Sequence, residues 1–306
     1  MSHSPVVTVV IPTYNHANFL REALGSLCAQ TYTDWEAIVV NNFSEDDTVE
    51  VVASFADSRI RLESFRNNGV IAASRNRGIA LARGIYVAFL DSDDTWYPSK
   101  LMRCVPYLDQ DADLVSHGLR YVGDSERDVF CGPQQRATFD ALLNKGSCII
   151  PSASLVRKSI LQSVGCFSER PAFNTSEDYH LWIKLALAQA KMVFIDELLG
   201  EYRVHASNHS GSALNHLNSV LHVIDEFLPI DSSSSLKLRL RVKRCKALPY
   251  YGAGRRLYKN GQFAKAWMLF FNSLVSWPFY VKIYVAIVLN GLGWIGSKFN
   301  IARPRL

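Results

Sequence analysis

The sequence contains neither a close pair of cysteines nor an uninterrupted apolar run long enough to cross a bilayer. Its six cysteines are scattered over 306 residues, which argues against a disulfide framework and against a zinc site. The apolar stretches near the C-terminus are interrupted by Pro278, Lys282 and Asn290, and each half falls short of the ~18 residues that a spanning helix needs. No basic and then apolar leader precedes the first strand-like run. We therefore expect a cytoplasmic protein.

Acidic residues are nearly absent from the last quarter of the chain. Residues 231–306 contain 14 Lys and Arg but 1 acidic residue, a net charge of +13, whereas residues 1–230 contain 19 and 27, a net charge of −8. A cationic tail on an acidic body predicts an anionic partner, either lipid or nucleic acid. The change in composition predicts two regions, with residues 1–215 as one domain and residues 216–306 as a basic, aromatic-rich helical region.

The first two hundred residues alternate between strand-like and helix-like runs. Short apolar runs at residues 6–11, 37–40, 60–65 and 86–90 predict strands. Apolar residues at helical spacing predict helices between them, at residues 19–28, 46–55 and 70–82. This alternation predicts an α/β fold with a mostly parallel sheet and helices on both faces. In such sheets ligands bind at the carboxyl ends of the strands.

Three carboxylates follow the last of these strands. The segment YVAFLDSDDTWYP, residues 86–98, places Asp91, Asp93 and Asp94 directly after a buried strand. Two carboxylates one residue apart can share Mg²⁺ or Mn²⁺ with the oxygens of a diphosphate. The alternative is an acidic turn in which Asp94 or Thr95 caps a helix that begins near Pro98.

Polar groups also follow the other strands. Pro12 and Tyr14 could lie against a nucleotide, and Asn41 and Asn42 could pair with a base edge or a ribose. Either loop could equally be turn chemistry, because Asn, Asp and Ser satisfy their own backbone in turns. The guanidinium of Arg75 could hold a phosphate through two hydrogen bonds. The alternative is that Arg75 lies on a solvated basic face.

Taken together and in order, these segments resemble the family 2 inverting glycosyltransferases, which have a Rossmann-like glycosyltransferase A-type fold. The likeness covers about residues 6–210, and its motifs are VTVVIPTYN (7–15), IVVNNFSEDDT (38–48), SRNRGIALA (74–82), AFLDSDDTWYP (88–98), EDYHLW (177–182) and YRVH (202–205). The resemblance implies a nucleotide-diphosphate sugar as donor, Mn²⁺ or Mg²⁺ as cofactor, and inversion at the anomeric carbon.

Carried over position by position, the resemblance assigns the donor site. It implies that Pro12, Tyr14 and Asn41 lie near the nucleobase and that Arg75 lies near the donor. It further implies that Asp91 lies close to the ribose and diphosphate and that Asp93 binds the metal. The sequence departs from the family at Asn41 and Asn42, where two aspartates are common. An amide can donate as well as accept, so the choice of base stays open. A nucleotide-sugar-binding protein without transfer activity is the alternative that this departure leaves.

The resemblance also implies a catalytic base and a further metal ligand. Direct displacement requires a carboxylate that takes the proton from the acceptor hydroxyl, and the family's base matches Asp178. Without the resemblance, Glu177 and Asp178 would simply favour the N-terminus of a helix. His205 matches a position that binds the metal or the diphosphate, although a lone histidine is more often a satisfied loop residue. We assign no ligand role to His209.

Sequences that resemble this one usually belong to the assembly of lipopolysaccharide, capsule or exopolysaccharide. The resemblance therefore implies a transferase of such a process that acts on a lipid-linked saccharide. For the tail we favour interfacial helices on the inner face of the plasma membrane over a nucleic-acid partner. Residues 236–246 show no clean period. In the rest of the tail we expect five aromatic residues at the level of the lipid headgroups: Trp267, Trp277, Tyr280, Tyr284 and Trp294. We expect six basic residues to face anionic lipid: Arg255, Arg256, Lys259, Lys265, Lys282 and Lys298. The alternative is a helical hairpin packed on the catalytic domain or on a second subunit.

Overall fold

The computed structural model describes residues 4–205 and 212–298, the side chains of 296–298 excepted. Its strands are β1 Val7–Thr13, β2 Trp35–Asn41, β3 Ile60–Ser64, β4 Tyr86–Phe89, β5 Thr95–Trp96, β6 Leu114–Gly123, β7 Arg127–Val129, β8 Ser154–Arg157 and β9 Met192–Val204. Its α-helices are α1 Ala17–Cys28, α2 Thr48–Ser54, α3 Ile71–Leu81, α4 Lys100–Asp109, α5 Phe139–Lys145, α6 Lys158–Ser163, α7 Glu177–Leu187, α8 Ala213–Phe227, α9 Leu236–Lys259, α10 Phe263–Ser276 and α11 Lys282–Lys298.

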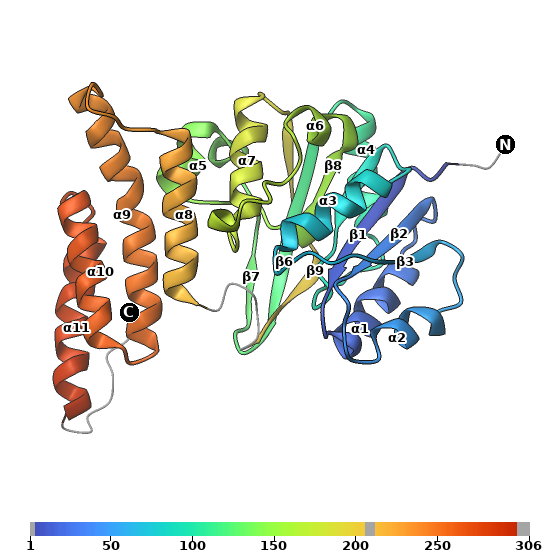
Figure 1. The fold of residues 1–306 in the computed structure, drawn as a ribbon, viewed down its shortest axis with the longest axis horizontal. Helices are drawn as coiled ribbons and strands as arrows, with labels where there is room; N and C mark the ends of the chain where they lie inside the picture. The colour runs from blue at the N-terminus through green and yellow to red at the C-terminus, as the bar shows by residue number, and fades with distance from the viewer. Residues whose placement is uncertain (1–3, 206–211, 299–306) are drawn as a thin grey trace. The chain divides into compact units, whose positions relative to one another are not determined.

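The chain forms two compact units. The first comprises Met1–Leu142 and Ser147–Asn208, and the second comprises Leu143–Gly146 and His209–Leu306. All the strands belong to the first unit, and the helices α8 to α11 belong to the second (Figure 1).

The nine strands within the described residues form one sheet in the order β3-β2-β1-β4-β8-β6-β9-β5, with β7 beside β6. The strands β1 to β4 run parallel to one another, which confirms the α/β fold predicted from the sequence. The later half is mixed, because β8 runs antiparallel to both β4 and β6. The sequence predicts neither β6 nor β8, since both lie in a stretch without clear periodicity.

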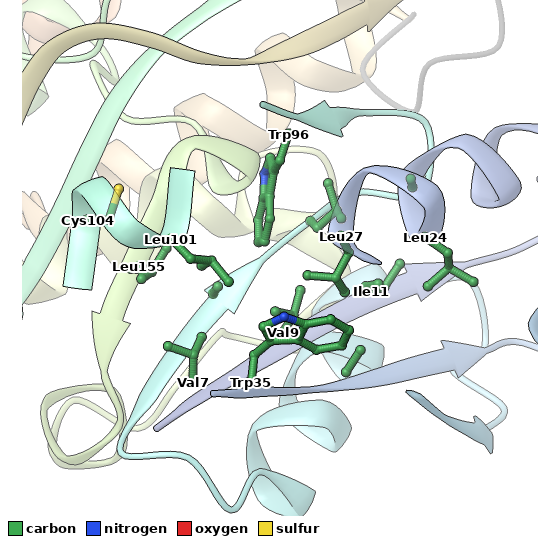
Figure 2. Close-up of a cluster of buried hydrophobic side chains, with 14 of the residues drawn as sticks. Val7, Val9, Ile11, Leu24, Leu27, Trp35, Trp96, Leu101, Cys104 and Leu155 are labelled. Atoms are coloured by element: carbon green, nitrogen blue, oxygen red, sulfur yellow. The ribbon is translucent and has the colours of Figure 1, made fainter. Parts of the chain in front are cut away.

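Side chains at alternate positions of β1 point to opposite faces of the sheet. Val7, Val9 and Ile11 pack with Trp35 and Leu27 in the core beneath α1 (Figure 2). On the other face, α3 approaches β1 so closely that a Cβ on Gly78 would lie 2.3 Å from Cγ1 of Val10. Helices therefore cover both faces, as expected for a buried parallel sheet.

This topology brings distant polar segments to one edge. Because β1, β2 and β4 run in parallel, the loops that follow Thr13, Asn41 and Phe89 leave the same edge of the sheet. The short strand β5 then pairs with β9 through Trp96 and Gly200. This pairing brings the end of β9 to the loop that carries Asp91, Asp93 and Asp94, which we call the acidic loop.

The second unit has its own core, which the helices α8 to α11 build from apolar and aromatic side chains. The helix α9 includes residues 236–246, where the sequence shows no clean helical period, and it continues through Pro249. Gly254 explains the close packing there, because a Cβ at this position would lie 2.7 Å from the ring of Phe270 on α10. The predicted break at Pro278 is present, between α10 and α11.

Across the described residues, we find no helix with the length and apolar character needed to span a bilayer. The side chain of Lys298, predicted to face lipid, lies outside the described residues.

Candidate active site

Two loops at the carboxyl edge of the sheet are bonded to each other. The backbone N–H of Asn15 donates to Oγ of Ser44 (2.9 Å), and Oδ1 of Asn15 accepts from the backbone N–H of Glu45 (2.8 Å). The carboxylate of Asp46 accepts from the N–H of Ala17 at the start of α1 (2.8 Å). The loops after β1 and β2 therefore form one continuous surface.

The residues predicted to contact the nucleobase lie in and beside this surface. Tyr14 is 51% exposed, so its ring is accessible for stacking, while Pro12 is buried in β1. Asn41 is buried, and its Oδ1 accepts from both N–H (3.0 Å) and O–H (2.7 Å) of Ser44. Oδ1 of Asn42 accepts from N–H of Asn67 (2.9 Å). The turn chemistry is thus present, and a contact of Asn41 with a base stays a prediction.

Arg75 holds two carboxylates that are distant in sequence. Its Nη1 donates to Oε1 of Glu177 (2.6 Å) and its Nη2 donates to Oδ1 of Asp91 (2.7 Å). The guanidinium is 3% exposed, so the solvated-face interpretation is wrong. Burial alone would lower the pKa of Arg75, but the charges of Asp91 and Glu177 outweigh it and raise that pKa. Arg75 therefore connects α3, the acidic loop and α7.

Asp178 follows Glu177 in the first turn of α7, and its side chain is only partly exposed. Burial first, and then the neighbouring charge of Glu177, raise its pKa to about 7, while the positive charge of Arg75 opposes them. A carboxylate with this pKa can accept a proton near neutral pH, as a general base must. The helix-terminus interpretation also applies, since both acids lie at the N-terminus of α7.

Asp93 and His205 meet at the other side of the acidic loop. Nε2 of His205 lies 3.0 Å from Oδ2 of Asp93, and the imidazole stacks on Phe19 with ring centroids 5.0 Å apart. Burial and the charge of Asp91 raise the pKa of Asp93, against the hydrogen bond from His205. His209 lies outside the described residues.

The donor set fits a divalent cation that shares its ligands with a substrate. Within the described chain, no group of three or more His, Cys, Asp and Glu residues is arranged to hold a metal. One carboxylate and one imidazole leave most coordination positions for water and phosphate oxygens, which is how Mg²⁺ and Mn²⁺ are usually held beside nucleotides.

Asp94 has a structural place that the sequence does not predict. Its Oδ1 accepts from the backbone N–H of Arg203 (3.0 Å), and α4 begins only after Ser99, without a side-chain cap. The interpretation of Asp94 as a helix cap is therefore wrong. Burial and the charges of Asp93 and Asp91 raise the pKa of Asp94 well above its ordinary value, which favours a neutral acid.

Three contributors to the site were missed from the sequence or given another role. Oγ of Ser152 accepts a hydrogen bond from the backbone N–H of Asp91 (3.1 Å). Arg203 anchors the acidic loop from β9, through Asp94 and through a bond from Nε to O of Asp93 (3.3 Å). Glu177 is buried against Arg75. The motifs EDYHLW and YRVH flagged two of these positions, but only the fold shows what they contact.

A sheet edge that gathers carboxylates, an imidazole and adjoining polar loops is typical of the ligand-binding edge of α/β enzymes. The family model described as "Glycosyl transferase family 2" matches residues 8–165. The chain belongs to that family and is a glycosyltransferase.

Relatives and solved structures agree with this assignment. An uncharacterized glycosyltransferase of Rickettsia prowazekii is 32% identical over 235 residues, which cover 74% of this chain and 72% of that protein. The UDP-Glc:alpha-D-GlcNAc-diphosphoundecaprenol beta-1,3-glucosyltransferase WfgD of Escherichia coli is 27% identical, over 73% of this chain and 87% of WfgD. The solved structure of a mannosyltransferase from Pyrobaculum calidifontis, in complex with GDP-Man and Mn²⁺, superimposes with a TM-score of 0.59 at 17% identity, covering 98% and 87% of the two chains. That last likeness shows the fold alone.

Proposed function

We propose that residues 1–215 form a catalytic domain that transfers a sugar from a nucleotide-diphosphate donor to an acceptor hydroxyl, with inversion at the anomeric carbon. The observation that carries this proposal is the connection between the acidic loop and α7. Arg75 bonds Asp91 on one side and Glu177 on the other, and Asp178 is the next residue along the chain. The same buried guanidinium therefore connects the predicted donor site with the predicted base.

In this proposal Asp178 accepts the proton of the acceptor hydroxyl as that oxygen attacks the anomeric carbon and the nucleoside diphosphate leaves. A pKa of about 7 means that a large share of the molecules is ready to accept a proton at neutral pH. Glu177 and Arg75 hold the N-terminus of α7 against the donor site. Tyr14 and Asn41 would contact the nucleobase, and Asp91 would lie near the ribose and the diphosphate.

Asp93 and His205 would hold a divalent cation, Mn²⁺ or Mg²⁺. The cation supplies positive charge that stabilises the departing diphosphate. The mannosyltransferase that shares this fold binds Mn²⁺ together with GDP-Man, which supports a metal and a nucleotide-sugar donor here.

The acceptor and the cellular setting form the wider part of the proposal. WfgD is named for a UDP-glucose donor and a diphosphoundecaprenol-linked acceptor. We propose an acceptor of the same chemical kind, a lipid-linked saccharide, in lipopolysaccharide, capsule or exopolysaccharide assembly. An enzyme with such an acceptor would work at the cytoplasmic face of the plasma membrane, as a peripheral protein on anionic lipid.

A thermal-shift panel of nucleotide-sugars with Mn²⁺ tests the donor site, because a ligand that binds only the folded state raises stability by mass action. The donor that gives a shift is then incubated with a soluble acceptor, and the anomeric configuration of the product is read by NMR. A product with retained configuration contradicts the proposal. A clear shift without transfer or donor hydrolysis favours the alternative of a nucleotide-sugar-binding protein, which Asn41 and Asn42 motivate.

A further inference from the structure

The helix α11 is apolar on two opposite sides. One side is buried in the core of the second unit through Ile283 and Ala286. The opposite side carries an apolar stripe whose members are each 52–61% exposed: Val285, Val288, Leu292 and Ile295. Their spacing of three, four and three residues places them on one face of a helix. A helix that is apolar all round is normally covered on all sides.

The helix α10 continues this apolar face. It carries a second exposed set, formed by Trp267, Met268, Phe271 and Val275. The two sets adjoin, because a Cβ on Gly291 of α11 would lie 3.6 Å from Cζ2 of Trp267. The connection between the helices adds Phe279, which is 76% exposed. We call these nine residues the α10–α11 face. Exposed apolar surfaces that are contiguous over two helices usually mark a binding surface.

The charges around the α10–α11 face identify the chemistry of its partner. Lys265 on α10 and Lys282 on α11 are exposed, and no acidic residue follows Asp231 in the sequence. A second copy of this chain would bring two cationic surfaces together, which is unfavourable. A bilayer with anionic headgroups offers apolar chains for the stripe and opposite charge for the lysines.

We propose that the α10–α11 face inserts into the headgroup and upper acyl layer of an anionic phospholipid bilayer, with both helices lying in the plane of the membrane. Since none of the described helices can span a bilayer, an in-plane position is the one that these lengths allow. The inference rests on the proposed function in one respect, namely that a lipid-linked acceptor gives the enzyme a reason to be at the membrane.

Co-sedimentation with vesicles tests the apolar part. Wild-type protein should bind vesicles of phosphatidylglycerol and phosphatidylcholine, and the double variant Val288→Asn, Leu292→Asn should bind at least about tenfold more weakly. The matched control is Ile85→Asn in the first unit, whose side chain is 56% exposed and which should bind like wild type. Equal binding of the double variant and wild type overturns the proposal.

A second pair of variants tests the charges. Lys265→Gln with Lys282→Gln should weaken binding to the anionic vesicles by about tenfold or more at low salt, and by less as salt screens the attraction. Lys191→Gln, an exposed lysine of the first unit, should change little. The proposal is overturned if wild-type protein does not bind vesicles and sediments as a dimer, and if Val288→Asn with Leu292→Asn dissociates that dimer. This result would assign the α10–α11 face to a second copy of the chain.

The outcome is separable from that of the proposed function. Vesicle binding without any nucleotide-sugar shift rejects the proposed function alone. A nucleotide-sugar shift that all these variants share, together with no vesicle binding by wild type, rejects the membrane inference alone. Circular dichroism of each variant shows whether α8 to α11 remain folded.

Discussion

Arg75 and Glu177 lie 102 residues apart and form a buried ion pair with Nη1 2.6 Å from Oε1. Breaking such a pair leaves an uncompensated charge in a region of low polarity, which costs more than the pair itself contributes. Within the described residues, neither Nε of Arg75 nor Oε2 of Glu177 has a hydrogen-bond partner. The pair is therefore strongly coupled but not fully satisfied, and it lies where a donor diphosphate is expected.

The first prediction compares this pair with an exposed one. Glu177→Gln should lower the free energy of unfolding of the first unit by about 3 kcal/mol, because Arg75 then retains only Asp91 as a counter-charge. Glu63→Gln is the matched control, since the exposed pair of Arg77 and Glu63 has the same N to O distance of 2.6 Å and exposed pairs contribute below about 1 kcal/mol. Urea unfolding followed in both variants measures the difference, and equal losses would contradict a special role for the buried pair.

Local sequence patterns predicted the first half of the fold well. The strands β1 to β4 and the helices α1 to α3 lie where apolar periodicity placed them, and the run that ends at Asp91 is a buried strand. These elements are set by local patterning, in which each apolar side chain has one face to bury.

The parts that were missed depend on contacts between distant residues. Arg75 looks the same in sequence whether it faces water or two carboxylates, and only the fold brings Glu177 to it. The helix α9 includes residues 236–246, which show no clean period in the sequence, and only the fold shows that it packs on α10 at Gly254. Asp94 bonds to Arg203, 109 residues away, and not to the helix that follows it.

The second prediction separates binding from chemistry. Asp178→Asn should lower turnover by about 10²-fold or more and leave donor affinity near wild type, because a general base acts in the transition state and not in donor binding. Steady-state kinetics and the thermal shift with donor measure the two quantities. Normal turnover with a raised Michaelis constant would make Asp178 a binding residue.

The same residue has a pH signature. With a pKa raised to about 7, wild-type turnover should rise with pH and level off above neutrality, and Glu177→Gln should move the midpoint to lower pH by removing a like charge. The raised pKa stabilises the fold when Asp178 is protonated, and this contribution is lost as pH rises through about 7. Asp178→Asn should therefore unfold at a higher temperature than wild type at pH 8, and this advantage should vanish at about pH 4. A fixed advantage at every pH would contradict the assignment.

The third prediction concerns the metal. Asp93→Asn should abolish most of the Mn²⁺-dependent part of donor binding, because a neutral amide is a weaker ligand than a carboxylate. Asp94→Asn is the control, since burial already favours the neutral acid there and its Oδ1 bond to Arg203 can be kept by an amide. Titration of Mn²⁺ in the presence of donor measures both. Loss of metal dependence in the Asp94 variant alone would move the site to Asp94.

The last prediction addresses the departure at Asn41. A carboxylate at this position can accept the same two hydrogen bonds from Ser44 that Oδ1 of Asn41 accepts now, so Asn41→Asp should preserve the turn. The substitution replaces the side-chain nitrogen by an oxygen, so the position loses a hydrogen-bond donor, because an amide can donate and a carboxylate cannot.

If Asn41 reads the base, Asn41→Asp should alter the ranking of uridine, thymidine and guanosine donors in the thermal-shift panel. Asn42→Asp is the comparison variant, because Oδ1 of Asn42 accepts from the backbone N–H of Asn67, a bond that a carboxylate also accepts. A changed ranking in this variant alone would assign the base contact to Asn42. An unchanged ranking at position 41, with donor binding intact, would mean that the side chain shapes the loop only and that the base is held by the backbone around Tyr14.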